Sequence, residues 1–129
     1  MAQIKIYGVR ESLDVMKSQL SNVIHSCVVE VLQFPSDKRF HRFFALEEDD
    51  FLFPSDKSSR YTIIEVSMME DRTAETKKRL IHLLFERAQS ELDLSANDLE
   101  ITITETSKCD WGFRGQTGDE IALNYKVEV

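Results

Sequence analysis

The sequence predicts an α+β fold in which two duplicated β-α-β units form one four-stranded mixed sheet with both helices on one face. Two observations predict it. Residues 61–104 read as a strand, a charged turn, a long amphipathic helix and a second strand. Residues 4–44 follow the same order at an offset of 60 residues. A β-α-β unit makes its strands parallel with a right-handed crossover, and two such units sharing one sheet form one domain with a single core.

The composition fits a single globular domain spanning residues 1–129. The hydrophobic content is 42%, the charged content is 30% and the net charge is -7. An acidic chain is unsuited to nucleic acid, which requires a basic surface. No apolar run approaches the roughly 20 residues of a membrane span. Because the first residues enter a predicted strand directly and the two cysteines form no C-x-x-C motif, we expect no leader and a reduced, cytoplasmic setting.

The first unit begins with a strand at residues 4–7 that Gly8 ends. Ser12 is the expected cap of the following helix, and His25 lies off its apolar stripe, so we expect it to be solvated. Residues 34–38 form a turn, and residues 39–46 form the second strand. That strand places Arg39 and His41 on one face. The helix stripe consists of Leu13, Met16, Leu20, Val23, Ile24, Cys27, Val28 and Val31.

The second unit begins with a β-branched strand at residues 62–68, followed by a charged turn at residues 69–72. Thr73 is the expected N-cap of the next helix, and Glu75 complements its dipole. Residues 99–104 alternate isoleucine and threonine, the period of a strand. Its helix stripe consists of Leu80, Ile81, Leu84, Phe85, Ala88 and Leu92.

The two units, residues 4–44 and 64–104, match without a gap. Ile4 and Ile6 fall on Ile64 and Val66, and the helix stripes coincide. The alternative is a chance alignment of two amphipathic helices. The segment Phe-Pro-Ser-Asp-Lys occurs at residues 34–38 and again at 53–57. Its spacing differs from the repeat, so we interpret it as shared turn chemistry.

Three of the four glycines lie in the segment 107–118, which also contains Trp111, the only tryptophan. No helix and no Gly-Lys-Ser/Thr follow, so the glycines are neither a dinucleotide fingerprint nor a P-loop. We expect a structured loop or hairpin there. Residues 125–129 are the expected final edge strand.

The sheet face away from the helices is expected to be semi-polar. A lone subunit could leave it in water, or further copies of the chain could cover it, which is the interpretation that we favour. The expected residues of this face are Lys5, Tyr7, Glu65, Ser67, Thr102 and Thr104, or the complementary set of alternate residues.

Arg72 is the strongest candidate for binding. It precedes a predicted helix N-terminus, where free N–H groups and the dipole favour an anion, and its guanidinium can grip a carboxylate with two hydrogen bonds. The alternative is a surface ion pair with Glu70 or Asp71. His41 and His82 have no partner at metal-ligand spacing, so we expect no metal site.

The duplicated unit, the segment Glu70-Asp71-Arg72-Thr73 and the segment Asp110-Trp111-Gly112-Phe113 together resemble the tautomerase superfamily, in its branch resembling malonate semialdehyde decarboxylase. The sequence is also similar to 4-oxalocrotonate tautomerase and macrophage migration inhibitory factor. The resemblance covers nearly the whole chain. It implies a cofactor-free enzyme and a homotrimer whose pockets lie between subunits near the first strand.

The resemblance also assigns roles to residues. Arg72 matches the arginine that binds the substrate carboxylate, while Trp111 and Phe113 match the pocket walls. The position of an acid that activates water holds Lys38, with Asp37 beside it, and the position of a second arginine holds Glu70. Ala2 occupies the place of the catalytic amino-terminal proline, so its amine would replace that group once Met1 is removed. Arg39 and Arg114 are secondary candidates for substrate binding.

Two functions follow from this resemblance. The first is a tautomerase-like enzyme for a small 2-oxo or unsaturated carboxylic acid, in which Arg72 binds the carboxylate and the Ala2 amine moves the proton. The second is a non-catalytic trimer that binds a small acid or a protein partner, motivated by the missing proline. The sequence specifies neither the substrate nor the pathway.

Overall fold

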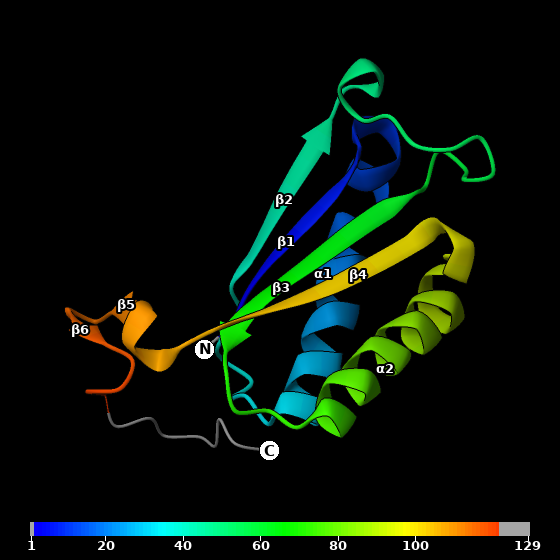
Figure 1. Cartoon of the computed structure of the whole chain (residues 1–129). Helices are drawn as coiled ribbons and strands as arrows, with labels where there is room; N and C mark the ends of the chain where they lie inside the picture. The colour runs from blue at the N-terminus through cyan, green and yellow to red at the C-terminus, as the bar shows by residue number, and fades with distance from the viewer. Residues whose placement is uncertain (1, 122–129) are drawn as a thin grey trace.

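A four-stranded sheet covered on one face by two long helices makes up most of the chain. Figure 1 shows the computed structural model, which describes residues 2–121. The strand order is β2-β1-β3-β4. β1 and β3 are antiparallel at the centre, and each outer strand runs parallel to its inner neighbour. The predicted fold class is thereby confirmed.

The elements follow one another in the predicted order, and the expected strand at residues 125–129 lies outside the described residues. The inner strands are β1 (Ala2–Val9) and β3 (Thr62–Met69), the outer strands are β2 (His41–Leu46) and β4 (Leu99–Thr106), and the helices are α1 (Arg10–Leu32) and α2 (Ala74–Leu92). The 3-10 turns are η1 (Glu48–Asp50), η2 (Ala96–Asp98) and η3 (Lys108–Asp110), and a small hairpin consists of β5 (Gly112–Phe113) and β6 (Gln116–Thr117).

The strand register repeats at the offset found in the sequence. In the first unit Ile4 of β1 pairs with His41 of β2, and in the second unit Ile64 of β3 pairs with Ile101 of β4. Each residue of the second pair follows its counterpart by 60 positions. The 3-10 turns η1 and η3, which follow the outer strands, start at the same offset. The two units are therefore built to one geometry, although few of their residues are identical.

The two helices start differently. α1 begins directly after β1, and its N-cap residue Val9 has no side-chain hydrogen bond. Ser12 lies inside that helix, so its predicted role as the cap was wrong. Before α2 a short turn intervenes, and the hydroxyl of Thr73 accepts a hydrogen bond from the backbone N–H of Thr76. The predicted cap of the second helix is thereby confirmed.

The core lies between the helices and the covered face of the sheet, where alternate residues of β1 and β3 are buried. His25 belongs to this buried side, with 7% of its surface exposed. Its Nε2 lies 2.7 Å from the carbonyl oxygen of Ser36. The prediction that His25 is solvated was wrong, because the loop after α1 folds back over that face of the helix. The fully buried core side chains include Ile6, Leu13, Leu20, Ile24, Leu32, Ile64, Met68, Leu80 and Leu84.

No helix within residues 2–121 covers the other face of the sheet. Its side chains are half-buried or exposed, as the sequence predicts. Tyr7 donates a hydrogen bond of 2.6 Å to Glu65, and its ring stacks on Phe44 with the centroids 4.9 Å apart. Phe40, at the start of β2, is 47% exposed. This face therefore combines hydrogen-bonded polar groups with accessible aromatic rings.

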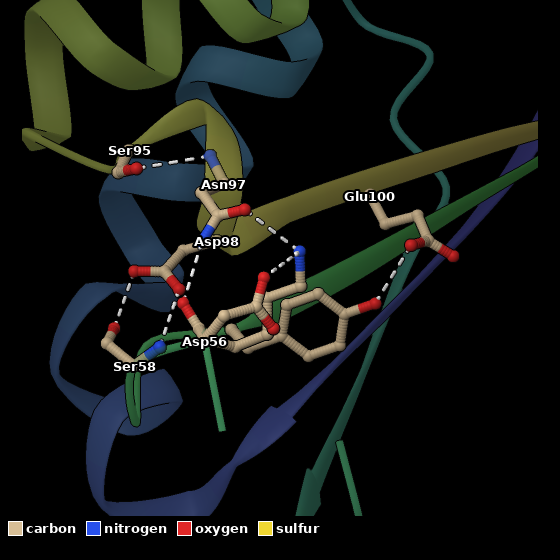
Figure 2. Close-up of polar contacts among 8 residues, drawn as sticks. Asp56, Ser58, Ser95, Asn97, Asp98 and Glu100 are labelled. Atoms are coloured by element: carbon tan, nitrogen blue, oxygen red, sulfur yellow. Dashed lines mark hydrogen bonds and ion pairs between the residues drawn. The ribbon is translucent and has the colours of Figure 1, made fainter. Parts of the chain in front are cut away.

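A polar cluster fastens the loop before β3 to η2 and β4 (Figure 2). The buried carboxylate of Asp98 accepts two hydrogen bonds from Ser58, one from the backbone N–H at 2.8 Å and one from the side-chain hydroxyl at 2.5 Å. Lys57 donates to the side-chain oxygen of Asn97 at 3.0 Å. Within residues 2–121, no helix is long and apolar enough to cross a membrane.

Candidate functional site

The candidate residues that the sequence singles out are best placed relative to the two ends of the sheet. We call the end at which β1 starts and β3 stops the site end, and the other the opposite end. At the site end Ala2 pairs with Met68 of β3. The side chain of Ala2 faces the helices and is 3% exposed. The first residues of β1 are therefore held within the sheet close to the turn that carries Arg72.

Arg72 lies in the turn between β3 and α2 and is 5% exposed. Its Nη1 donates a hydrogen bond of 3.3 Å to the carbonyl oxygen of Met69, and its guanidinium carbon lies 5.3 Å from the ring centroid of Phe34. A cation over an aromatic face is held by the ring quadrupole. Phe34 was not among the predicted site residues. Because Phe34 closely follows α1, and the last turn of α1 lies at the site end, its place in the sequence could have indicated that it belongs to the site.

The turn that carries Arg72 is strained. Asp71 has a φ of 92°, a value that costs a residue other than glycine about 1–3 kcal/mol. Its carboxylate lies 3.3 Å from the Nζ of Lys108 in η3. The backbone N–H of Glu70 donates to the carbonyl oxygen of Thr106 at 3.0 Å. Both contacts bind the turn to the end of β4.

Trp111 directly follows η3, and its backbone N–H donates to the carbonyl oxygen of Lys108 at 3.3 Å. It borders an open hollow of about 340 Å³ on the uncovered face at the site end. Gln3 and Ser67 were not predicted as site residues, although their alternation with Lys5 and Glu65 places them on this face. The hollow is lined by Gln3, Ser67, Thr106, Asp110, Trp111 and Gly112.

The hairpin β5-β6 confirms the structured segment predicted around Trp111, and it packs against the Arg72 turn. The backbone N–H of Gly118 donates to the carbonyl oxygen of Trp111 at 2.7 Å. A Cβ atom on Gly118 would lie 2.6 Å from the terminal methyl of Met69 and 2.8 Å from the carbonyl oxygen of Lys108. Only glycine can therefore lie so close to Met69 and Lys108. The hairpin is thus pressed against the residue whose carbonyl oxygen binds Arg72.

Phe113 lies apart from the hollow beside Trp111. It borders a second open hollow, of about 410 Å³, together with residues of the hairpin itself. The guanidinium of Arg114 lies 5.5 Å from its ring centroid. Trp111 therefore lies beside the sheet, and Phe113 belongs to the outer part of the hairpin.

Asp37 and Arg39 lie between α1 and β2. Asp37 is exposed in the turn closed by the hydrogen bond from Lys38 N–H to the carbonyl oxygen of Pro35, at 3.0 Å. Arg39 donates to Asn22 of α1 at 2.8 Å and so reaches toward that helix. The structure thus brings Ala2, Arg72 and Trp111 to the site end, and Asp37 and Arg39, which directly precede the parallel strand β2, lie at the same end beside α1.

His41 at the start of β2 lies beside Arg39. Its Nδ1 is 2.8 Å from the hydroxyl of Ser21. Burial, with smaller contributions from the charge of Arg39 and from His25, lowers the pKa of His41 from 6.5 to about 4. The imidazole is therefore neutral at pH 7 and is suited to hydrogen bonding there rather than to carrying a charge.

The site end has the elements of an anion site. A guanidinium and the first N–H groups of α2 favour a carboxylate, and Trp111 offers an aromatic wall beside polar side chains. Across residues 2–121, no group of three or more His, Cys, Asp or Glu side chains is arranged to hold a metal ion.

Comparison with known proteins agrees with this arrangement. The family described as "Tautomerase enzyme" matches residues 38–114, more than half of the chain. The chain is 26% identical over 105 residues to the probable tautomerase YusQ of Bacillus subtilis (strain 168), covering 78% of this chain and 83% of that protein. It is 26% identical over 100 residues to the probable tautomerase YrdN of the same organism, covering 74% and 77%.

Solved structures show the same fold. Malonate semialdehyde decarboxylase superposes with a TM-score of 0.79 at 20% identity, covering 88% of this chain and 92% of that one. A fused 4-OT solved as an asymmetric trimer superposes with a TM-score of 0.80 at 20% identity, covering 92% and 97%. With the family match across β2, β3, α2, β4 and the Trp111 segment, these likenesses lead to one conclusion: the chain belongs to the tautomerase family.

Proposed function

We propose that the protein is a cofactor-independent, tautomerase-like enzyme that acts on a small 2-oxo or unsaturated carboxylic acid. The reaction is keto–enol tautomerisation or a related decarboxylation or hydration. The observation that carries this proposal is the placement of Arg72 at the N-terminus of α2, at the end of the sheet where Ala2 and Trp111 also lie. A buried guanidinium binds an anion more strongly than an exposed one, because the local dielectric is low.

Each residue has a role in the proposed reaction. Arg72 binds the substrate carboxylate, and the Ala2 amine takes the proton from the enol or the α-carbon and returns it to the other position. A free α-amine has a reference pKa of about 7.7–8, and a neighbouring guanidinium lowers the pKa of such a group toward neutral pH. Trp111 and Phe113 exclude water. Asp37 and Arg39 are proposed as outer contacts of the substrate.

The proposed active form is a homotrimer in which partner copies cover the uncovered sheet face. Support comes from the accessible rings of Phe40 and Phe44 on that face and from the structural neighbour that is itself a trimer. Since Phe113 lies in the outer part of the hairpin, a pocket completed by a partner copy is the arrangement that would let it contribute. The free thiols of Cys27 and Cys109 support a cytoplasmic setting.

The test is the enol-to-keto conversion of phenylpyruvate by the wild type and by Arg72→Ala. We expect the variant to lose most of kcat/KM, because a charge-assisted grip on the carboxylate is removed. Equal rates would exclude Arg72 from the mechanism. No turnover of phenylpyruvate or of other small 2-oxo and unsaturated acids would refute the enzyme proposal.

The second candidate is a non-catalytic trimer that binds a small acid or a protein partner. Ala2 favours it, because the superfamily that the sequence resembles uses a proline at this position. Intact mass distinguishes the two candidates, since an Ala2 amine exists only after Met1 is removed. Retained Met1, together with binding of phenylpyruvate but no conversion, would favour the second candidate.

A further inference from the structure

We propose that Asp71 and Lys108 are positioning residues that lock the Arg72 turn to Trp111 and so set the separation between the anion-binding guanidinium and the aromatic wall. This inference rests on the proposed function, since it concerns how the same site selects its ligand. Its structural core is the 3.3 Å ion pair between the carboxylate of Asp71 and the Nζ of Lys108.

The first step concerns the strained backbone of the turn. Asp71 has a φ of 92°, whereas the helix-ending residues Gln33 and Asp93 have values of 58° and 53°, close to the ordinary left-handed region. Strain of this kind persists only where neighbouring contacts impose it. Lys108 supplies a contact from outside the turn, and Arg72 is the next residue along the chain. A change at the Asp71 carboxylate therefore reaches the Arg72 backbone directly.

The second step concerns the other side of the lock. The side chain of Lys108 forms the ion pair with Asp71. Its backbone carbonyl oxygen accepts a hydrogen bond of 3.3 Å from the backbone N–H of Trp111. Gly118 approaches the same carbonyl oxygen and the methyl of Met69 so closely that a Cβ atom could not be added. Lys108 is thus a single residue in contact with both the Arg72 turn and the segment that carries Trp111.

The opposite end of the sheet provides the matched comparison. The positions equivalent to Asp71 and Lys108 are Glu11 and Glu48, which carry like charges. An ion pair between Arg10 and Glu47, 2.8 Å apart, joins the corresponding segments there. Both ion pairs are at least partly exposed to solvent, so each contributes little to stability. Only the Asp71–Lys108 pair, however, lies between an arginine and a tryptophan that the proposed reaction uses.

The experiment compares Lys108→Met and Asp71→Asn with the matched control Arg10→Met. For phenylpyruvate we expect KM to rise about three- to tenfold in the first two variants, with kcat within about twofold, because misplaced binding groups weaken substrate positioning. Lys108→Arg keeps the ion pair and should restore KM. Arg10→Met should leave KM unchanged. Acrylamide quenching of Trp111, the only tryptophan, should increase in Lys108→Met and not in Arg10→Met.

The outcomes separate this inference from the proposed function. A wild type that converts neither phenylpyruvate nor other small 2-oxo and unsaturated acids refutes the proposed function, and the lock is then judged by Trp111 quenching alone. Unchanged quenching and unchanged KM in Lys108→Met would overturn the lock. An equal rise in KM in Arg10→Met would also overturn it, because the effect would then be general loosening. If Asp71→Asn misfolds, Asp71→Gly, which relieves the strain and removes the charge, replaces it in the comparison.

Discussion

The two ends of the sheet consist of equivalent positions of the two units, yet they are filled in different ways. At the site end Arg72 occupies a turn before its helix, and Trp111 borders an open hollow. Their counterparts at the opposite end, at the same 60-residue offset, are Ser12 and Phe51. There Tyr61 is buried and packs against Phe51, with the ring centroids 5.7 Å apart.

The difference originates in where each helix begins. α1 starts one residue after β1, whereas four residues separate β3 from α2. Those four residues create the turn that holds Arg72, and the first unit has no room for such a turn. At the opposite end aromatic rings fill the space and form a small core of their own. One end of a duplicated fold is thus used for packing, and the other keeps the buried guanidinium of Arg72 in a turn and the ring of Trp111 beside open space.

The largest expected effect concerns the aromatic cluster at the opposite end. Tyr61→Ala should reduce the free energy of unfolding by about 3–4 kcal/mol, because it removes a buried ring and its contacts. Trp111→Ala, at the position that corresponds to Phe51, should cost about 1 kcal/mol or less. Urea unfolding at one protein concentration measures both, since association shifts apparent stability. Equal losses would mean that the site end is packed as tightly as the opposite end.

The next effect concerns Arg72, whose counterpart at the opposite end is the uncharged Ser12. Arg72→Lys should weaken phenylpyruvate binding by about 1.5–3 kcal/mol, roughly 10- to 100-fold, because an ammonium cannot reproduce a two-bond grip on a carboxylate. Quenching of Trp111 fluorescence by the ligand measures the affinity. The matched control is Ser12→Ala at the equivalent position, which should not change it. An unaltered affinity in Arg72→Lys would show that the guanidinium does not hold the carboxylate.

Most of the fold could be predicted from the sequence, because the apolar periods of strands and helices repeat at one offset. The start of α1 could not. Ser12 is a good cap by type, but β1 continues to Val9 and leads straight into the helix. His25 was misplaced for a similar reason: helical periodicity describes one helix, whereas the loop that buries His25 folds back from residues beyond it.

A third effect concerns His41, which occupies in β2 the position of Ile101 in β4. Burial, with smaller contributions from the charge of Arg39 and from His25, lowers its pKa from 6.5 to about 4. The unfolded chain therefore binds a proton at a higher pH than the folded chain does. This contribution to stability is complete above about pH 6.5, declines as the pH falls, and levels off below about pH 4.

The size of the His41 effect follows from the shift. The full shift would correspond to about 3 kcal/mol, and solvent screening of a half-buried group reduces it to about 1–2 kcal/mol. His41→Gln should flatten the difference in unfolding free energy between pH 7 and pH 4.5 by that amount. His82→Gln, on the exposed side of α2, should leave the difference unchanged. The same flattening in both variants would exclude His41 as the source.

The site was less predictable than the fold. Arg72 and Trp111 could be identified from residue type and local pattern, since each follows an element whose end is visible in the sequence. Phe34 and Lys108 were missed, because each meets the Arg72 turn from an element distant in sequence. Local periodicity carries no information about which loops meet at the end of a sheet. Such contacts can be predicted only once the pairing of the strands is known.

The smallest expected effect tests the two helix starts from which the difference between the ends arises. Thr73→Ala should lower the free energy of unfolding by about 1 kcal/mol, because the hydroxyl of Thr73 accepts a hydrogen bond of 3.1 Å from the backbone N–H of Thr76. Ser12→Ala should change stability by less than about 0.5 kcal/mol, since α1 begins at Arg10 and Ser12 caps nothing. A loss of about 1 kcal/mol in Ser12→Ala would place the start of α1 three residues later, with Ser12 as its N-cap. The first unit would then have room for a turn like the one that holds Arg72, and the contrast between the two ends would rest on side chains alone.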